Sequence, residues 1–228
     1  MAKGEFAWPS NTERTTILGR TGSGKTQMGA FILSRSPFDK QPYIIFDYKG
    51  DELLGSIDRI REIGLNEALP KAPGVYIIRP GVVETEPVEK YLWKIWEQTH
   101  LGLYFDESYM VPNSGPHDRG ALQAIYTQGR SLRLPVIALS QRPAWLSGFF
   151  YSEADHFAVF HLNDERDEKA VQRFFPRGSL RNADRLEDYH SRWYSVKSNS
   201  LYLMKPVPDA DTIRNELNDR LLPKRRYV

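Results

Sequence analysis

Short apolar runs alternate with longer mixed segments along most of the chain. Six runs of four or five mostly apolar residues occupy positions 15–18, 43–46, 75–78, 101–105, 136–140 and 157–161. The segments between them are long enough for the crossovers that parallel strands require. Short apolar strands that alternate with helices are typical of a parallel sheet covered on both faces. We therefore predict a doubly wound α/β fold with a mostly parallel sheet flanked by helices.

The pattern changes after residue 189. Two strand-like runs at 193–196 and 201–204 flank a polar turn, which predicts a hairpin at the far edge of the sheet. Residues 209–222 then predict a short helix with Asp209 or Asp211 as its N-cap. We expect one domain over residues 1–228, with a core at about 13–190. The hairpin, the helix and a basic tail occupy 191–228.

Composition excludes several kinds of function. The 228 residues carry a net charge of only +2, so any contact with nucleic acid has to be local. The absence of cysteine excludes disulfides and thiol catalysis, and the five histidines do not have the spacing of metal ligands. No apolar run reaches the roughly 18 residues of a membrane-spanning helix, and residues 1–10 lack the pattern of a signal peptide. We expect a protein that contacts a membrane only through a partner.

The segment GRTGSGKT at 19–26 fits the pattern G-x-x-x-x-G-K-[ST], the Walker A motif, in full. It follows the strand at 15–18 and precedes a helix-compatible run at 27–34. Backbone N–H groups of such a loop and the helix N-terminus bind phosphate oxygens. We expect Lys25 to contact the β- and γ-phosphates of ATP and Thr26 to hold Mg²⁺. The predicted nucleotide-binding residues are Gly19, Arg20, Thr21, Gly22, Ser23, Gly24, Lys25 and Thr26.

Two acids follow the apolar run at 101–105 and predict the second half of the site. Asp106 at the carboxyl end of a parallel strand would lie beside the phosphate loop, where it can hold Mg²⁺ together with Thr26. Glu107 can orient the attacking water or accept its proton. This Walker B-type pair favours water as the acceptor of the phosphoryl group.

Polar residues also surround the strand at 136–140. Gln141 follows it, and an amide can both donate to and accept from a γ-phosphate and its water. Arg130 is our candidate for an arginine finger supplied to a neighbouring subunit, and Arg133 and Arg142 are its rivals. An ordinary surface ion pair is an equally good interpretation of each arginine.

These motifs together resemble the FtsK–HerA family of DNA-pumping ATPases. The likeness rests on the loop at 19–26, the FDYKGD turn at 46–51, the acid pair, the Gly129-Arg130 pair and the block Ser140-Gln141-Arg142-Pro143. The segment at 161–167 is similar to an acidic segment of the family. The motifs follow the family's order over roughly residues 15–175, with Ser140 in place of the usual threonine.

The resemblance implies a ring, a hexamer or a pentamer, with ATP at the subunit interfaces, duplex DNA in the pore and Arg130 acting in trans. The chain shows neither the membrane helices of chromosome pumps, the N-terminal barrel of archaeal repair translocases, nor the nuclease domain of large terminases. It is most similar to the small genome-packaging ATPases of tailless double-stranded DNA viruses with an internal membrane. The implied partners are double-stranded DNA and a capsid vertex, portal or membrane protein, in the host cytoplasm or the virion.

Three segments are candidates for contact with DNA phosphates, which a pump grips without recognising bases. They are the loop at 112–120 with Arg119, the arginines at 177–185, and the tail at 224–226. For each one a solvated surface is an alternative interpretation.

Two other functions use the same phosphate loop. A small P-loop kinase would need an acceptor pocket and an arginine-rich lid, and the sequence shows no clear lid. A non-pumping ATPase of virion assembly would keep Lys25 but would not need Glu107 or Arg130. Substitution of each residue in turn therefore separates these hypotheses.

Overall fold

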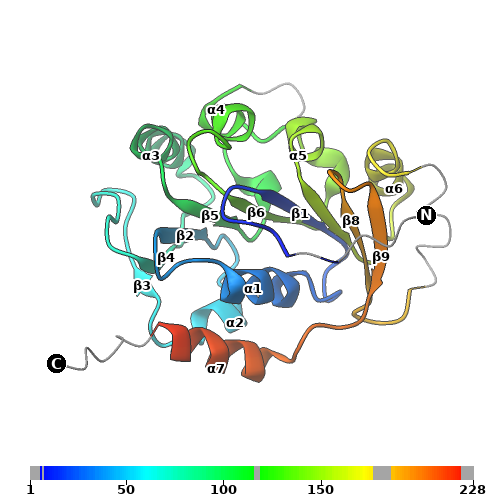
Figure 1. Cartoon of the computed structure of the whole chain (residues 1–228). Coiled ribbons are helices and arrows are strands. Elements are labelled where there is room, and N and C mark those ends of the chain that lie inside the picture. The colour runs from blue at the N-terminus through cyan, green and yellow to red at the C-terminus, as the bar shows by residue number, and fades with distance from the viewer. Residues whose placement is uncertain (1–5, 7, 116–118, 177–185, 222–228) are drawn as a thin grey trace.

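The computed structural model describes residue 6 and residues 8–115, 119–176 and 186–221, and these residues form a layered α/β structure (Figure 1). Within them, nine strands make one sheet in the order β3-β4-β2-β5-β6-β1-β7-β8-β9. The pairs from β3 to β7 are parallel, whereas β7–β8 and β8–β9 are antiparallel. The predicted fold class is therefore confirmed. The strands are β1 (Arg14–Leu18), β2 (Pro42–Phe46), β3 (Arg61–Glu62), β4 (Gly74–Ile78), β5 (Gly102–Phe105), β6 (Val136–Ser140), β7 (His156–Val159), β8 (Ser191–Ser195) and β9 (Ser200–Met204).

Helices cover both faces of this sheet, as Figure 1 shows, with α1, α2 and α7 on one face and α3 to α6 on the other. The helices are α1 (Lys25–Arg35), α2 (Glu52–Gly55), α3 (Thr85–Gln98), α4 (Ala121–Gln128), α5 (Phe149–Ser152), α6 (Glu165–Gln172) and α7 (Ala210–Arg220). Two 3₁₀ turns, η1 (Ser108–Met110) and η2 (Pro143–Trp145), follow β5 and β6.

The central strands are apolar throughout because both of their faces are buried. In β2, Tyr43 and Ile45 join the cluster that packs on α1, whereas Ile44 and Phe46 join the cluster beneath α3 and α4. Successive side chains of a strand point to opposite faces, so this sorting follows from the strand geometry. A continuous apolar run is therefore what a two-sided parallel sheet requires.

Neighbouring strands approach closely where β5 begins. A Cβ atom added to Gly102 would lie 2.2 Å from the ring of Tyr43 on the adjacent strand β2. The Tyr43 ring fills this space and is 1% exposed. Gly102 thus serves the packing of the sheet at a position where no other side chain fits.

The structure refines several boundaries. β7 ends at Val159, two residues earlier than predicted, although Phe160 still donates its backbone N–H to Leu18 at 2.8 Å. The hairpin lies at the sheet edge as predicted, and α7 begins after Asp209, whose carboxylate caps the N–H of Thr212 at 2.8 Å. Strand β3 was not predicted, because its two residues are charged and exposed and form no apolar run. None of the helices in the described ranges has the length and apolar character needed to cross a bilayer.

Candidate nucleotide-binding site

The phosphate loop connects the buried end of β1 to the first turn of α1. Gly22 and Gly24 adopt φ angles of 75° and 97°, a left-handed backbone conformation that glycine adopts without strain. The start of the loop is fastened on both sides, because Gly19 donates to Ser140 at 3.3 Å and Arg20 donates to His161 at 2.9 Å. This backbone is suited to present N–H groups to an anion at the helix N-terminus.

Some side chains of the loop point into the site and others point away from it. Lys25 is buried, and its Nζ atom donates to the carbonyl of Arg20 at 2.9 Å, across the mouth of the loop. Burial lowers the pKa of Lys25, while the Glu107 carboxylate opposes that effect. Arg20 points outward to Asp188 at 3.9 Å, and Ser23 is buried beneath the loop. Lys25 therefore fits the phosphate-binding role that the sequence predicts for it.

Thr26 and Asp106 meet at the carboxyl edge of the sheet. The Thr26 hydroxyl donates to Oδ1 of Asp106 at 3.2 Å. Burial, and then repulsion from the carboxylates of Asp51, Glu107 and Asp47, raises the pKa of Asp106 to about 7. A divalent cation would relieve this concentration of negative charge, and a hydroxyl and a carboxylate are ligands that Mg²⁺ accepts. Thr26 and Asp106 thus fit the metal role that the sequence predicts for them.

Glu107 lies deeper in the same site and is only 2% exposed. Its Oε1 atom forms an ion pair with Lys49, and its Oε2 atom accepts the backbone N–H of Gln141 at 3.4 Å. Lys49 itself belongs to a turn that Asp47 organises, since Asp47 Oδ1 accepts the N–H groups of Lys49, Gly50 and Asp51 at 2.8–3.3 Å. In the sequence this turn is visible only as a motif of the resembled family, and the contact of Lys49 with Glu107 is visible only in the structure.

Gln141 lies over the phosphate loop. Its Oε1 atom accepts a hydrogen bond from the Thr21 hydroxyl, which joins the end of β6 to the loop. The structure therefore brings Lys25, Thr26, Asp106, Glu107 and Gln141 to one edge of the sheet. This is the edge at which ligands of open α/β sheets bind.

Arg130 lies elsewhere. It follows α4 and forms an ion pair with Asp155, whose backbone N–H donates to Arg14 at the first residue of β1. The phosphate loop leaves the other end of β1, about 13 Å along a five-residue strand. The Arg130 side chain is 61% exposed. Within one chain Arg130 is therefore remote from the phosphate loop.

The two rival arginines also have defined positions. Arg142 pairs with Asp164 at 3.5 Å and Asp167 at 3.9 Å, and its guanidinium lies over the ring of Trp145. Arg133 is exposed and has a φ angle of 53° in the turn before β6. Arg142 thus pairs with acids of its own subunit near the site. Arg130 and Arg133 lie instead at the amino ends of the strands, opposite the phosphate loop.

An apolar cavity of about 250 Å³ adjoins the phosphate loop and can hold the nucleobase. It is lined by Gly24, Gln27, Met28, Phe160, Tyr189, Pro206, Val207 and Asp209. The Tyr189 ring lies over Gly24, where an added Cβ would be 3.2 Å from its Cδ1 atom. This pocket could not be predicted from the sequence, because its walls come from segments far apart in the chain.

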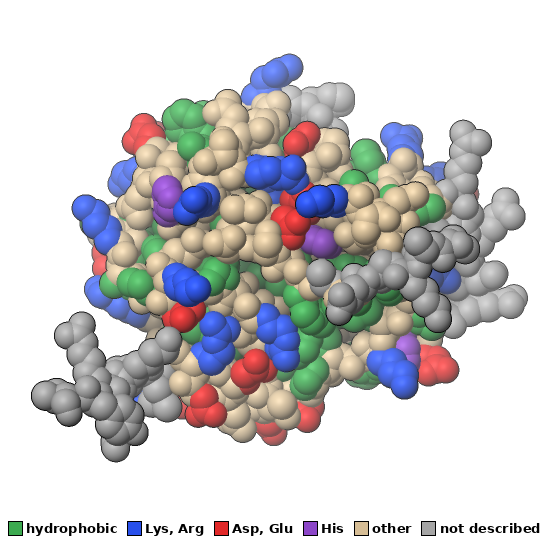
Figure 2. All heavy atoms as spheres, viewed as in Figure 1, with side chains coloured by type: hydrophobic (Ala, Val, Ile, Leu, Met, Phe, Trp, Pro, Cys, Tyr) green, Lys and Arg blue, Asp and Glu red, His purple; other side chains and the backbone are tan. Residues whose placement is uncertain are grey.

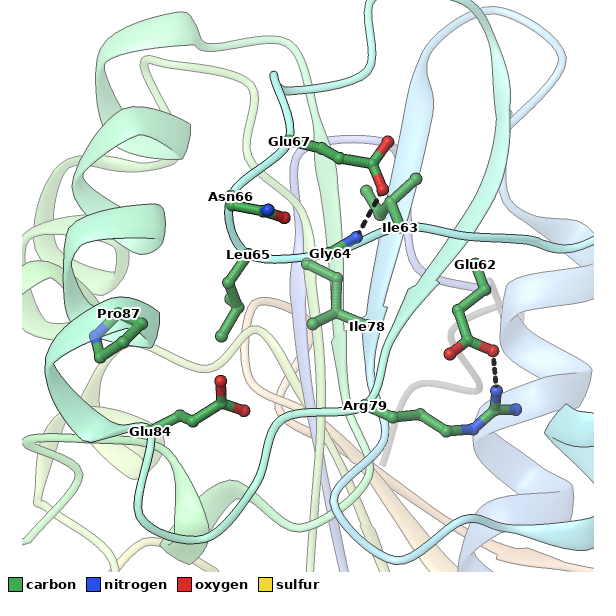
Figure 3. Close-up of a pocket in the computed structure, with 10 residues that line it drawn as sticks. All are labelled: Glu62, Ile63, Gly64, Leu65, Asn66, Glu67, Ile78, Arg79, Glu84 and Pro87. Atoms are coloured by element: carbon green, nitrogen blue, oxygen red, sulfur yellow. Dashed lines mark hydrogen bonds and ion pairs between the residues drawn. The ribbon is translucent and has the colours of Figure 1, made fainter.

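A larger cavity, of about 720 Å³, lies at the β3 edge of the sheet (Figure 3). Its carboxylates are engaged locally: Glu62 pairs with Arg79, Glu67 accepts the N–H of Gly64 at 2.8 Å, and Glu84 accepts that of Gly81 at 2.6 Å. Arg79 also reaches Asp47 at 3.2 Å. The wall of this cavity thus supports the turn that carries Lys49, and its acidic lining is unsuited to phosphate.

Basic side chains do not form a continuous band on the face seen in Figure 2, where they alternate with acidic ones. Arg119 is exposed at the end of the loop that follows η1. The predicted arginine group at 177–185 and the tail at 224–226 lie outside the described residues. This face therefore suits a local contact with nucleic acid.

Fold and site together define a P-loop nucleoside triphosphatase. No family model matches the chain. The chain is 40% identical over 213 residues to the DNA packaging ATPase P9 of Enterobacteria phage PRD1. The aligned region covers 90% of this chain and 92% of that protein. The chain belongs to the family of this DNA packaging ATPase.

Solved structures agree with this fold. The genome packaging NTPase B204 of Sulfolobus turreted icosahedral virus 2, in complex with AMPPCP, is 18% identical and superposes with a TM-score of 0.69 over 87% of this chain and all of that one. The pCW3 conjugation coupling protein TcpA with ATPγS is 14% identical, with a TM-score of 0.59 over 92% of this chain and 65% of that one. At this level of identity the likeness shows the fold alone.

Proposed function

We propose that the protein is an ATPase that drives double-stranded DNA into a viral capsid. The observation that carries this proposal is the convergence of Thr26, Asp106 and Glu107 with Lys25 at the mouth of the phosphate loop. The relative from phage PRD1, which is called a DNA packaging ATPase, supplies the biological setting.

The residues of the site divide the work of hydrolysis. Lys25 and the loop N–H groups bind the phosphates, and Glu107 accepts the proton of the attacking water. Gln141, held over the loop by Thr21, orients that water against the γ-phosphate. Thr26 and Asp106 would hold Mg²⁺, which when bound would supply positive charge to offset that of the phosphates. Lys49 and the backbone N–H of Gln141 hold the buried Glu107 carboxylate in place at this edge, which favours this role.

The placement of Arg130 supports a ring. A residue on the amino-terminal edge of the sheet cannot reach its own phosphate loop at the carboxyl edge, but it can reach that of a neighbour in a head-to-tail arrangement. We expect a hexamer or pentamer with duplex DNA in its pore and with ATP and Mg²⁺ at each interface. A capsid vertex, portal or membrane protein would dock the ring in the host cytoplasm or the virion.

Steady-state ATP hydrolysis with and without long double-stranded DNA at low salt tests the proposal. Glu107→Gln serves as the blank, because it should bind ATP and lose turnover. DNA-stimulated hydrolysis that disappears in this variant supports a motor. A rate of ATP hydrolysis that DNA does not change at any protein concentration would favour an assembly ATPase. Phosphoryl transfer to a small acceptor would favour a kinase.

A further inference from the structure

Tyr109 connects the two halves of the catalytic edge. It lies in η1, two residues after Glu107, and this turn is closed by the N–H of Met110, which donates to the Glu107 carbonyl at 3.0 Å. The Tyr109 hydroxyl reaches across to the end of β6, where it accepts a hydrogen bond from Nε2 of Gln141 at 3.1 Å. One side chain thus links the strand that carries Glu107 to the strand that carries Gln141.

The Gln141 amide is held from two sides. Nε2 is engaged by the Tyr109 hydroxyl, while Oε1 accepts from the Thr21 hydroxyl on the phosphate loop. A hydroxyl can donate as well as accept, so these two contacts fix the place of the amide beside the loop whichever of its ends faces Thr21. Without the bond to Tyr109, the amide would be held by Thr21 alone.

The Tyr109 ring is itself supported. Its edge packs against Trp145 with ring centroids 5.3 Å apart at 80°, and the Arg142 guanidinium covers Trp145 at 4.6 Å. The backbone carbonyl of Tyr109 accepts from the Ser114 hydroxyl at 3.1 Å, and Ser114 in turn accepts the N–H of Ser147 at 2.8 Å. Residues of both loops at this edge thus hold the Tyr109 ring and backbone in place.

We infer that Tyr109 is the positioning residue of Gln141 and holds this amide beside the phosphate loop, where it can contact the attacking water. The inference rests on the proposed role of Gln141 in ATP hydrolysis and deepens it. Tyr109 does not contact the phosphate loop itself, so its contribution passes through Gln141. Loss of the hydroxyl alone should therefore slow the chemical step and leave nucleotide binding unchanged.

Tyr109→Phe, which keeps the ring on Trp145, tests this inference in the full-length protein. We expect kcat for ATP hydrolysis to fall roughly fivefold, as loss of one positioned hydrogen bond predicts, while KM stays near the wild-type value. Tyr76→Phe is the matched control, since its hydroxyl donates to the carbonyl of Ala72, just before β4, at 3.0 Å. Equal thermal midpoints for both variants would exclude a folding defect.

A double-mutant cycle separates positioning from a purely structural role. If Tyr109 acts through Gln141, the double variant Tyr109→Phe/Gln141→Ala should hydrolyse ATP no more slowly than Gln141→Ala. Additive losses in the double variant would overturn the inference about Tyr109 but not the proposed role of Gln141. A normal kcat for Tyr109→Phe together with a low kcat for Gln141→Ala would do the same. Normal turnover of Gln141→Ala would overturn the proposed role of Gln141 as well.

Discussion

Arg130 is paired with Asp155 at the edge of the sheet opposite the phosphate loop. Asp155 is fixed in turn, because its Oδ2 atom accepts the N–H of Arg14 at 3.0 Å and its carbonyl accepts that of Val196 at 2.9 Å. The Arg130 guanidinium thus pairs with a carboxylate that is itself held in place, while most of the arginine side chain faces solvent. A neighbour's γ-phosphate would have to compete with this carboxylate.

Mixed assemblies test the role of Arg130 in trans. Arg130→Ala should lower ATP turnover by about 10³-fold, which is the lower range for loss of an arginine finger, and leave ATP binding intact. Mixing Arg130→Ala with Lys25→Ala should restore part of the activity, because some interfaces then combine an intact loop with an intact arginine. Arg133→Ala is the control and should keep wild-type turnover. Absence of recovery at any mixing ratio would argue against a trans role.

Asp106 should set the requirement for magnesium. Asp106→Asn keeps the shape of the side chain and removes its charge, so the Mg²⁺ concentration for half-maximal ATPase activity should rise by about 10- to 100-fold. A magnesium titration at saturating ATP measures this directly. The partner variant Thr26→Ala should shift the same curve in the same direction. An unchanged titration for both would show that the metal is held by other groups.

Tyr189 should contribute to nucleotide affinity through the base. Tyr189→Ala removes the ring that lies over Gly24 and should weaken ATP binding by about 1–2 kcal/mol, in the range of base–aromatic stacking. Tyr189→Phe should bind ATP normally, since stacking needs only the ring. Calorimetry with a non-hydrolysable ATP analogue distinguishes the two variants. Equal affinities would mean that the base lies outside this cavity.

Gly102 should be intolerant of any side chain. Gly102→Ala places a methyl group against the Tyr43 ring and should lower the free energy of unfolding by about 1–3 kcal/mol, as overpacking of a core does. Gly148→Ala is a suitable control, because an added Cβ there meets nothing within 4 Å. Urea denaturation of both variants makes the comparison. A Gly102→Ala protein as stable as the control would mean that the sheet relaxes at no cost.

The sequence was informative wherever a local pattern dictates structure. The buried central strands and the phosphate loop were predictable, because each depends on residues adjacent in the chain. The pocket around Tyr189 was not, since it requires the packing of four distant segments. The ion pair of Lys49 with Glu107 joins residues 58 positions apart, and no periodicity encodes such a contact. Tertiary packing decides these features.

The opposite placement of Arg130 and the phosphate loop would also give the proposed ring a direction. If each subunit completes the site of the next, the ring closes head to tail and its two faces are unlike. Docking through one face would make the ATP cycle move DNA into the capsid. Docking through the other face would make the same cycle move DNA out of it. The choice between import and export would then be made by the partner that selects a face, while the chemistry at each interface stays the same.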